Sequence, residues 1–260
     1  MLNLSIGARL DVRVLEQLSD IAGARVSFYG APGGFSLDGG RITDESWDDF
    51  RSAVIYLSAH KIPFNLCCNT VLDPDRVTLT DRTLATLELA HRPGNGIIVA
   101  RHWLARRLRD QFPQYRLIFS SIGVLVEDWL EDRLFADYDV VVCPVNRISD
   151  FTLLGNPRHW CQLEVFLNNE CAAFGEQCLG HYHHTSLVNA GLTKRAEFSC
   201  PTLRKPTSGS TAPQPSVNDI RKYISLGVTR FKLIDRTASK LYLQPHLTRL
   251  KAAQSREQRQ

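Results

Sequence analysis

The segment "IPFNLCCNTVLDPDRVTLTDRTLATLELAHRPGNGIIVARH", residues 62–102, decides the fold. An apolar run at 62–70 leads to a stretch at 81–91 whose apolar residues recur three or four positions apart, and a second apolar run follows at 96–102. Short apolar runs are typical of buried strands, and the intervening period is typical of an amphipathic helix. The segment therefore predicts one strand–helix–strand unit of a parallel sheet.

The same alternation continues in both directions along the chain. Six further runs are predicted strands: LNLSIG (2–7), RVSFYG (25–30), YRLIFSSIG (115–123), DVVVCPVN (139–146), LEVFLNN (163–169) and TRFKLIDR (229–236). Helical periodicity lies between strands at 12–22, 44–60, 103–111 and 217–226. Eight strands that alternate with helices predict a single (β/α)8 TIM-type barrel of the α/β class over residues 1–250.

The segment between the last two predicted strands, residues 170–228, is much longer than the segments between the other strands. It contains "CPTLRKPTSGSTAPQPS", which is rich in Pro, Ser and Thr. We predict an insertion between strands seven and eight, in which residues 170–216 form a cysteine-bearing loop and linker and residues 205–216 are exposed. The final residues, 251–260, are predicted to be a polar tail.

The composition indicates an ordinary folded chain. Hydrophobic residues make up 43% and charged residues 22%, which supplies a full apolar core. A net charge of +4 permits an anionic partner without requiring nucleic acid. The sequence has no run of ~18 apolar residues for a membrane span and no apolar leader, so the expected location is the cytoplasm. Seven cysteines in a chain of this length favour thiolate chemistry or burial over disulfides.

Period-two alternation within the strands predicts which side chains point into the barrel. Cys67 shares its face with polar neighbours and is predicted to point inward, whereas Cys68 and Cys143 are predicted to face the helices. Glu164 and Lys232 lie on inward rows of strands seven and eight. We expect a buried glutamate to pair with a lysine or arginine across the lumen.

The stretch "NNECAAFGEQCLGHYHHTSL", residues 168–187, begins where strand seven ends. Active sites of such barrels gather at the carboxyl ends of the strands. Soft thiolates suit iron, and an iron–sulfur cubane takes four ligands. Cys171, Cys178 and Cys200 provide three, and Cys67 or a nearby histidine is the candidate for the fourth.

Two other interpretations of this stretch stay open. Cys178, His181 and His184 could hold zinc, although their spacing is not a usual zinc pattern. Free cysteines are also among the most buried residue types, so the sulfurs could be purely structural.

Four short motifs resemble the collagenase-like peptidase family U32, which includes the UbiU and UbiV proteins of oxygen-independent ubiquinone synthesis. "LEVFLNNECAAFGEQC" is similar to the family pattern LEVF-x-x-G-x-x-C-x6-C, and "LGVTRFKLIDR" is similar to aGV-x-x-x-KIEGR. "NTVLDPD" and "VVVCPVNRIS" also resemble family positions, and the similarity extends from Tyr29 to about Arg236.

The resemblance implies a [4Fe-4S] cluster on the cysteine pair and later cysteines, with hydroxylation that does not use molecular oxygen. The implied substrates are quinone precursors or RNA, and a heterodimer with a related barrel protein is a possible assembly. Three positions depart from the family pattern. Ile234 stands where the family has Glu, Asp235 where it has Gly, and Val145 where it has Arg, while Cys200 is the single cysteine after Cys178.

The charged residues near strands seven and eight are the candidate catalytic groups. Glu164 and Asp235 are suited to acid or base work, and an ion pair with Lys232 or Arg236 is the structural alternative. The sequence thus predicts an iron–sulfur-dependent, oxygen-independent hydroxylation or related modification of a small aromatic, quinone-precursor or RNA substrate. The alternatives are a non-catalytic partner subunit and a zinc-dependent hydrolase on the same barrel.

Overall fold

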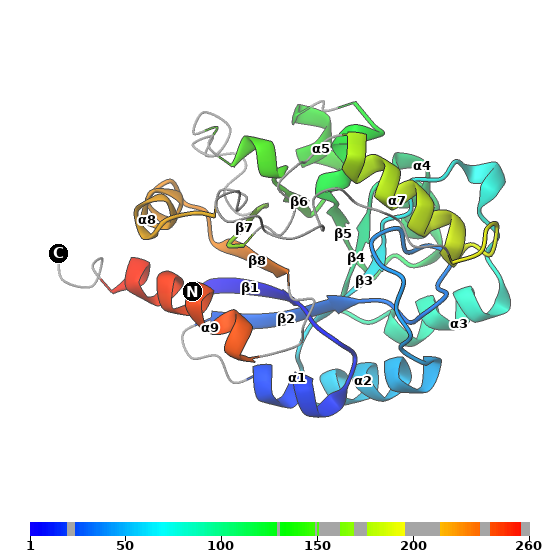
Figure 1. Ribbon diagram of the computed structural model, residues 1–260, viewed down its shortest axis with the longest axis horizontal. Helices are drawn as coiled ribbons and strands as arrows, with labels where there is room; N and C mark the ends of the chain where they lie inside the picture. The colour runs from blue at the N-terminus through cyan, green and yellow to red at the C-terminus, as the bar shows by residue number, and fades with distance from the viewer. Residues whose placement is uncertain are drawn as a thin grey trace.

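Eight parallel strands close into a barrel in the order of the sequence (Figure 1). The structure is a computed structural model, which describes residues 1–19, 24–128, 131–148, 150, 162–168, 176–195, 214–234 and 240–255. The strands are β1 (Leu2–Gly7), β2 (Ala24–Gly30), β3 (Phe64–Cys68), β4 (Gly96–Val99), β5 (Arg116–Phe119), β6 (Val140–Val142), β7 (Leu163–Phe166) and β8 (Arg230–Ile234). The predicted TIM-type barrel is therefore confirmed, although most predicted strands were too long.

The register brings inward-facing residues of neighbouring strands to the same level inside the ring. Phe166 of β7 pairs with Lys232 of β8, and Lys232 pairs in turn with Ser5 of β1. On the other side, Cys67 pairs with Ile98 of β4. Because side chains alternate along each strand, these residues point into the barrel while their neighbours face the helices.

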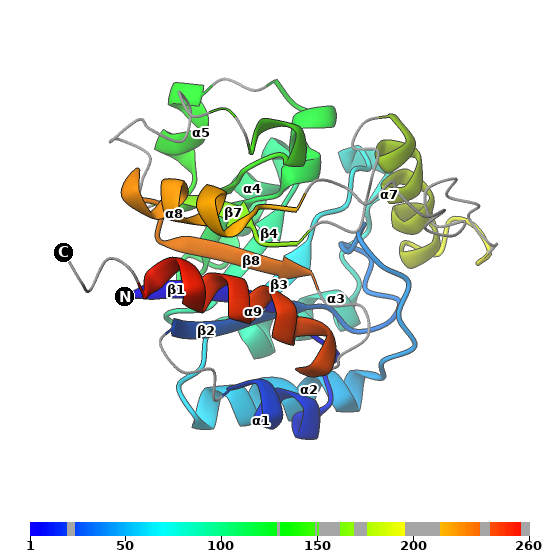
Figure 2. The ribbon, with the colours of Figure 1, turned by 60° about the vertical axis from the view of Figure 1, so that its left-hand side comes forward.

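Helices cover the outside of the ring (Figure 2). They are α1 (Val12–Ser19), α2 (Trp47–Ala59), α3 (Asp81–Ala90), α4 (His102–Gln111), α5 (Glu131–Asp137), α7 (Glu176–Asn189), α8 (Val217–Ser225) and α9 (Lys240–Gln254). Polar caps fix several starts: Ser46 and Asp49 form a capping box for α2, Ser216 and Asp219 form one for α8, and the Thr80 hydroxyl caps α3.

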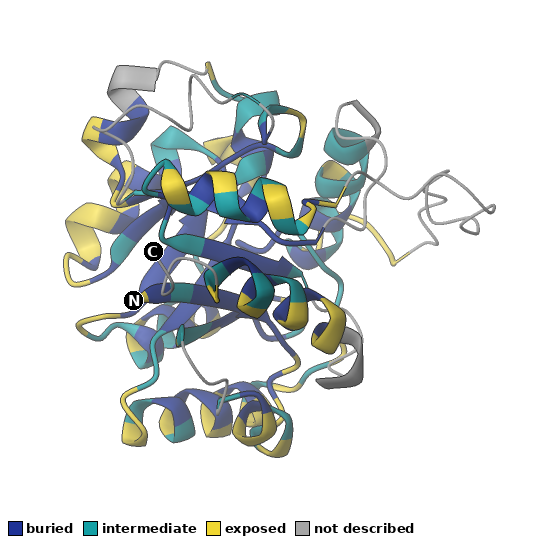
Figure 3. Cartoon of the chain, turned by 90° about the vertical axis from the view of Figure 1, so that its left-hand side faces the viewer, coloured by how far each residue is buried: buried dark blue, intermediate teal, exposed yellow. Residues whose placement is uncertain are grey.

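Figure 3 shows that the strands are largely buried. Part of the core lies between the strands and the helices. Phe50 of α2 packs edge-on against Phe64 of β3, with ring centroids 5.9 Å apart. Both rings are almost fully buried. Each buried aromatic contributes about 1.5–3 kcal/mol from area alone, so this contact stabilises the packing of α2 against β3.

The insertion between β7 and β8 contains two helices, α7 and α8. Residues 176–189, which we expected to be loop, form α7, and Figures 1 and 2 place this helix at the end of the barrel toward which the strand arrows point. Of the predicted linker 205–216, residues 205–213 lie outside the described residues. The predicted tail begins too early, because α9 continues to Gln254 and buries Ala253.

Within the described ranges, no helix is long and apolar enough to cross a membrane.

Candidate active site

A cavity of about 140 Å³ opens at the carboxyl ends of the strands. Six strands each contribute an inward side chain to it: Tyr29, Cys67, Ile98, Val142, Phe166 and Lys232. The loop after β2 and helix α7 complete the wall. The strand ends thus form the floor on which side chains from different parts of the chain converge, as expected for this fold.

Lys232, one of these lining residues, forms a buried ion pair with Glu164, with Nζ 3.3 Å from Oε2. The side chains are 7% and 9% exposed, so the pair is shielded from water on nearly all sides. The predicted pairing is confirmed, but it joins adjacent strands and does not cross the lumen. Lys232 lines the cavity and Glu164 does not, which makes Glu164 a residue that positions the lysine.

Tyr29 holds the other side of Lys232. The ammonium lies 3.8 Å from the centroid of the tyrosine ring, a favourable cation–π arrangement, and the Tyr29 hydroxyl donates to the Leu233 carbonyl at 3.1 Å. Burial raises the pKa of Tyr29 well above its ordinary value, so the phenol stays protonated. The ring fits only because residue 7 is glycine: a Cβ there would come within 2.6 Å of the ring.

The glycine-rich loop after β2 is largely buried and lines the cavity. Its Asp38 is 4% exposed and accepts a hydrogen bond from Gly40 N–H at 2.8 Å. Asn69 accepts from Gly39 N–H, and the Asn189 amide donates to the carbonyls of Asp38 and Arg41 at 2.9 and 2.8 Å. Burial is the main cause that raises the pKa of Asp38 to about 7.

Arg41 stands at the junction of this cavity and a wider outer pocket of about 640 Å³. Both are lined by Gly40, Arg41, Thr43, Glu45 and His181. The outer pocket also includes Arg9 and Asp49.

One face of α7 closes the cavity. Cys178, His181 and Tyr182 line it, and the next turns bury Thr185, Ser186 and Asn189. These positions follow the spacing i, i+3, i+4, i+7, i+8, i+11 of a single helix face. The Ser186 hydroxyl accepts from Val71 N–H at 3.2 Å, which attaches α7 to the loop after β3.

The cysteines of the chain differ in where the structure places them. Cys67 and Cys178 both line the cavity, and neither forms a disulfide. Cys68 and Cys143 are fully buried and do not line it, as the alternation predicts. Cys171 and Cys200 lie outside the described residues, as do Asp235 and Arg236. Burial raises the pKa of the Cys67 thiol to about 12, so it is a thiol unless a cation or metal opposes the burial.

In the parts of the chain that are described, no three His, Cys, Asp or Glu side chains are arranged to hold a metal ion. The zinc hypothesis named Cys178, His181 and His184; the first two line the cavity, whereas His184 does not. Of the proposed cluster ligands, Cys67 and Cys178 therefore line one cavity. That Cys171 and Cys200 join them stays a prediction.

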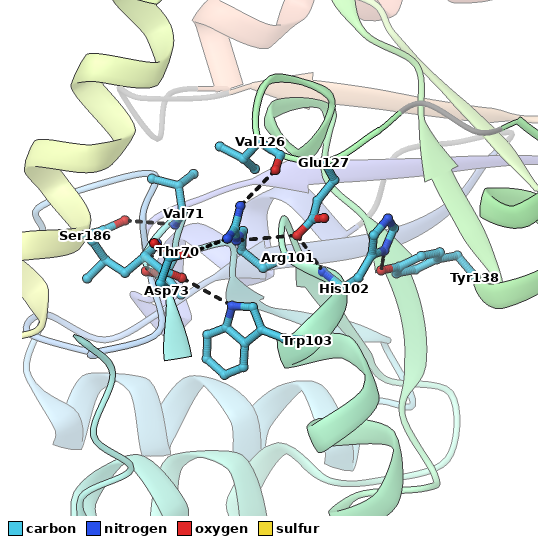
Figure 4. Close-up of polar contacts among 11 residues, drawn as sticks. Thr70, Val71, Asp73, Arg101, His102, Trp103, Val126, Glu127, Tyr138 and Ser186 are labelled. Atoms are coloured by element: carbon cyan, nitrogen blue, oxygen red, sulfur yellow. Dashed lines mark hydrogen bonds and ion pairs between the residues drawn. The ribbon is translucent and has the colours of Figure 1, made fainter. Parts of the chain in front are cut away.

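Figure 4 shows a separate polar network beside the cavity, centred on Arg101. Its guanidinium forms an ion pair with Asp73, lies 3.4 Å from Glu127 Oε1 and donates to the Val126 carbonyl at 2.8 Å. The Glu127 carboxylate also accepts from His102 N–H at 3.1 Å. Arg101 therefore ties the loop after β3 to the start of α4. Further along this helix, Arg106 and Arg107 are exposed.

Sequence reasoning missed four cavity residues: Tyr29, Asp38, Arg41 and Tyr182. The local signal for Asp38 and Arg41 was the motif "GGFSLDGGR", in which charged residues follow glycines directly after a predicted strand. Tyr29 was detectable as the inward position of the second strand. Tyr182 had no distinct signal, because its helix was not predicted.

No protein-family model and no curated protein matches the chain. A solved structure described as that of the U32 peptidase Mk0906 is similar, with a TM-score of 0.57. The match covers 90% of this chain and 93% of that chain at 10% sequence identity. An identity this low speaks for the fold alone. The chain therefore has the fold of a U32 peptidase.

Proposed function

We propose that this protein is an iron–sulfur-dependent enzyme that carries out an oxygen-independent hydroxylation, or a related modification, of a small aromatic or quinone-precursor substrate. The observation that carries the proposal is the position of Cys178. It belongs to the Cys171–Cys178 pair that resembles a cluster motif, and it lines the cavity at the barrel mouth together with Cys67.

The donor chemistry suits such a cluster. Cys171, Cys178 and Cys200 would supply three thiolates, and Cys67 or His181 would supply the fourth ligand from the wall of the same cavity. A bound [4Fe-4S] cluster would supply electron transfer or a Lewis-acidic iron.

The described residues supply the remaining parts of an enzyme site. Phe166, Ile98 and Val142 give an apolar wall that excludes water from a bound ring. The Lys232 ammonium contacts Glu164 and the Tyr29 ring, and an N–H that points into the cavity can donate a hydrogen bond to a substrate oxygen. Glu164 supports this donor from outside the cavity.

An RNA substrate receives less support than a small molecule. The cavity volume suits one ring, and Arg101 is engaged in the network of Figure 4. Contact with RNA would rely on Arg106 and Arg107 on the exposed face of α4.

A non-catalytic partner subunit is the second candidate function. Its support is Ile234, an apolar side chain that lines the cavity where the resembled motif has a glutamate. Activity of the chain alone, compared with activity in the presence of a related barrel protein, separates the two candidates. Zinc in place of iron would favour the hydrolase.

Anaerobic purification with iron, sulfide and zinc analysis tests the proposal. Brown protein with a charge-transfer absorption is expected, and Cys171→Ala or Cys178→Ala should lose the colour. Cys68→Ala is the control, because Cys68 is the neighbour of Cys67 in β3, is fully buried and does not line the cavity. Protein that stays colourless with ample iron, or that holds stoichiometric zinc, contradicts the cluster.

A further inference from the structure

The cavity has the size of a single aromatic ring. Its volume is about 140 Å³, and an apolar protein cavity of about 150 Å³ holds benzene. Ile98, Val142 and Phe166 form one wall, and Tyr29 and Tyr182 add aromatic surface. A planar apolar body therefore fills this space better than a flexible polar chain.

Arg41 adds a positive charge at the edge of this space. Arg41 lines the cavity, and its guanidinium makes no hydrogen bond or ion pair with any residue that the structure describes. The Arg41 backbone is fixed, because its carbonyl accepts from the Asn189 amide at 2.8 Å. A guanidinium has five donors in a planar fork and favours a carboxylate as partner.

The surrounding charges leave the Arg41 cation without a full counter-charge. The ammonium of Lys232 is offset by Glu164 at 3.3 Å. Burial raises the pKa of Asp38 to about 7 and also raises the pKa of Glu45. At a given pH, a smaller fraction of each carboxyl is therefore ionised than in an exposed side chain. His181 lies on the α7 side of the same space. The positive charge of Arg41 that these carboxyls leave uncompensated suits a ligand with one negative charge. A dianion would be repelled by any ionised Asp38 or Glu45.

We infer that the cavity binds a monocyclic aromatic carboxylate, with its ring against Phe166, Ile98 and Val142 and its carboxylate on the Arg41 guanidinium. The inference rests on the proposed function for the claim that this ligand is a substrate, and names its chemical class. Arg41 is then the residue that selects for negative charge, and the outer pocket is the entrance.

Calorimetric titration with benzoate and its neutral analogue benzamide tests the inference in protein purified in air. Benzoate should bind with a Kd below about 1 mM, and benzamide at least about 10-fold more weakly, because a charge-assisted bidentate pair is lost. Acetate should also bind more weakly than benzoate, because it leaves the apolar wall unfilled.

Arg41→Gln should weaken benzoate binding by about 10- to 100-fold and leave benzamide binding unchanged. Arg9→Gln is the matched control, because Arg9 lines the outer pocket but not the cavity. Arg41→Lys keeps the charge without the fork and should give an intermediate Kd. Thermal melting of each variant shows whether it is folded, and Arg41→Lys provides the test if Arg41→Gln is not.

Equal affinity for benzoate and benzamide, no saturable benzoate binding, or an unchanged Kd in Arg41→Gln would each overturn the inference. Tighter binding of phenyl phosphate or a mononucleotide than of benzoate would also overturn it, in favour of a phosphate ligand. The assay needs no cluster and no turnover. Protein that is colourless even after anaerobic purification with ample iron, yet binds benzoate through Arg41, therefore contradicts the cluster proposal alone. Protein that is brown after anaerobic purification but does not bind benzoate contradicts this inference alone.

Discussion

Lys232 and Glu164 are adjacent-strand neighbours whose charged groups meet 3.3 Å apart inside the barrel. Glu164→Gln removes one charge and leaves the ammonium buried without its partner. We expect a loss of about 3–5 kcal/mol in the free energy of unfolding, measured by urea denaturation. The double variant Glu164→Gln with Lys232→Met should recover much of this loss, because no buried charge remains. A single variant as stable as the parent would show that other groups neutralise Lys232.

Asp38 should make stability depend on pH. Its folded pKa is about 7, against about 3.9 in an unfolded chain, so between these values the folded state holds a proton that the unfolded state has lost. The contribution of Asp38 to stability is therefore present at low pH and falls as pH rises toward 7, by up to the order of 4 kcal/mol.

Asp38→Asn should remove this dependence while its amide oxygen still accepts from Gly40 N–H. The variant should gain stability relative to the parent between pH 5 and pH 8, as followed by thermal or urea unfolding of metal-free protein. Asp44→Asn is the control, since the Asp44 side chain is 84% exposed and should show no such gain. Parallel pH profiles for parent and Asp38→Asn would contradict the assignment.

Gly7 should tolerate no larger residue. In Gly7→Ala the new Cβ would lie 2.6 Å from the Tyr29 ring and displace it from Lys232. We expect a destabilisation of about 1–3 kcal/mol. Gly30 also lines the cavity, but in Gly30→Ala the new Cβ would lie 3.4 Å from its nearest neighbour, a carbon of Leu10. This variant should therefore lose less stability. Equal losses in the two variants would mean that backbone freedom matters here and ring contact does not.

Asn189 links α7 to the loop that carries Asp38 and Arg41. Asn189→Ala leaves two carbonyls without their donor and should cost about 1–3 kcal/mol. It should also weaken benzoate binding, because the Arg41 backbone is no longer fixed. His183→Ala, on the exposed side of the same helix, is the comparison that should change neither quantity.

The barrel was predictable from sequence because its signals are local. Runs such as GIIV show a strand by themselves, and alternation alone placed Cys67 inward and Cys68 outward. The ends of the strands were less predictable, because apolar residues such as Val145 and Ile122 continue into turns that line the mouth.

The mouth of the barrel was harder to predict because its parts meet through contacts between distant residues. Helix α7 has no apolar stripe, since its inner face carries Cys178, His181, Tyr182 and Ser186. The burial of Asp38 depends on Asn189, which lies 151 positions later in the chain. No local pattern contains such a contact.

The seam between β1 and β8 has a consequence for synthesis on the ribosome. Leu2–Gly7 pairs on one side with Arg230–Ile234, so one edge of the first strand has no partner until almost the whole chain has been made. At typical elongation rates this interval lasts for tens of seconds. An apolar strand edge left open for that time is prone to pair with other nascent chains. Chaperone demand should therefore be highest just before the eighth strand emerges.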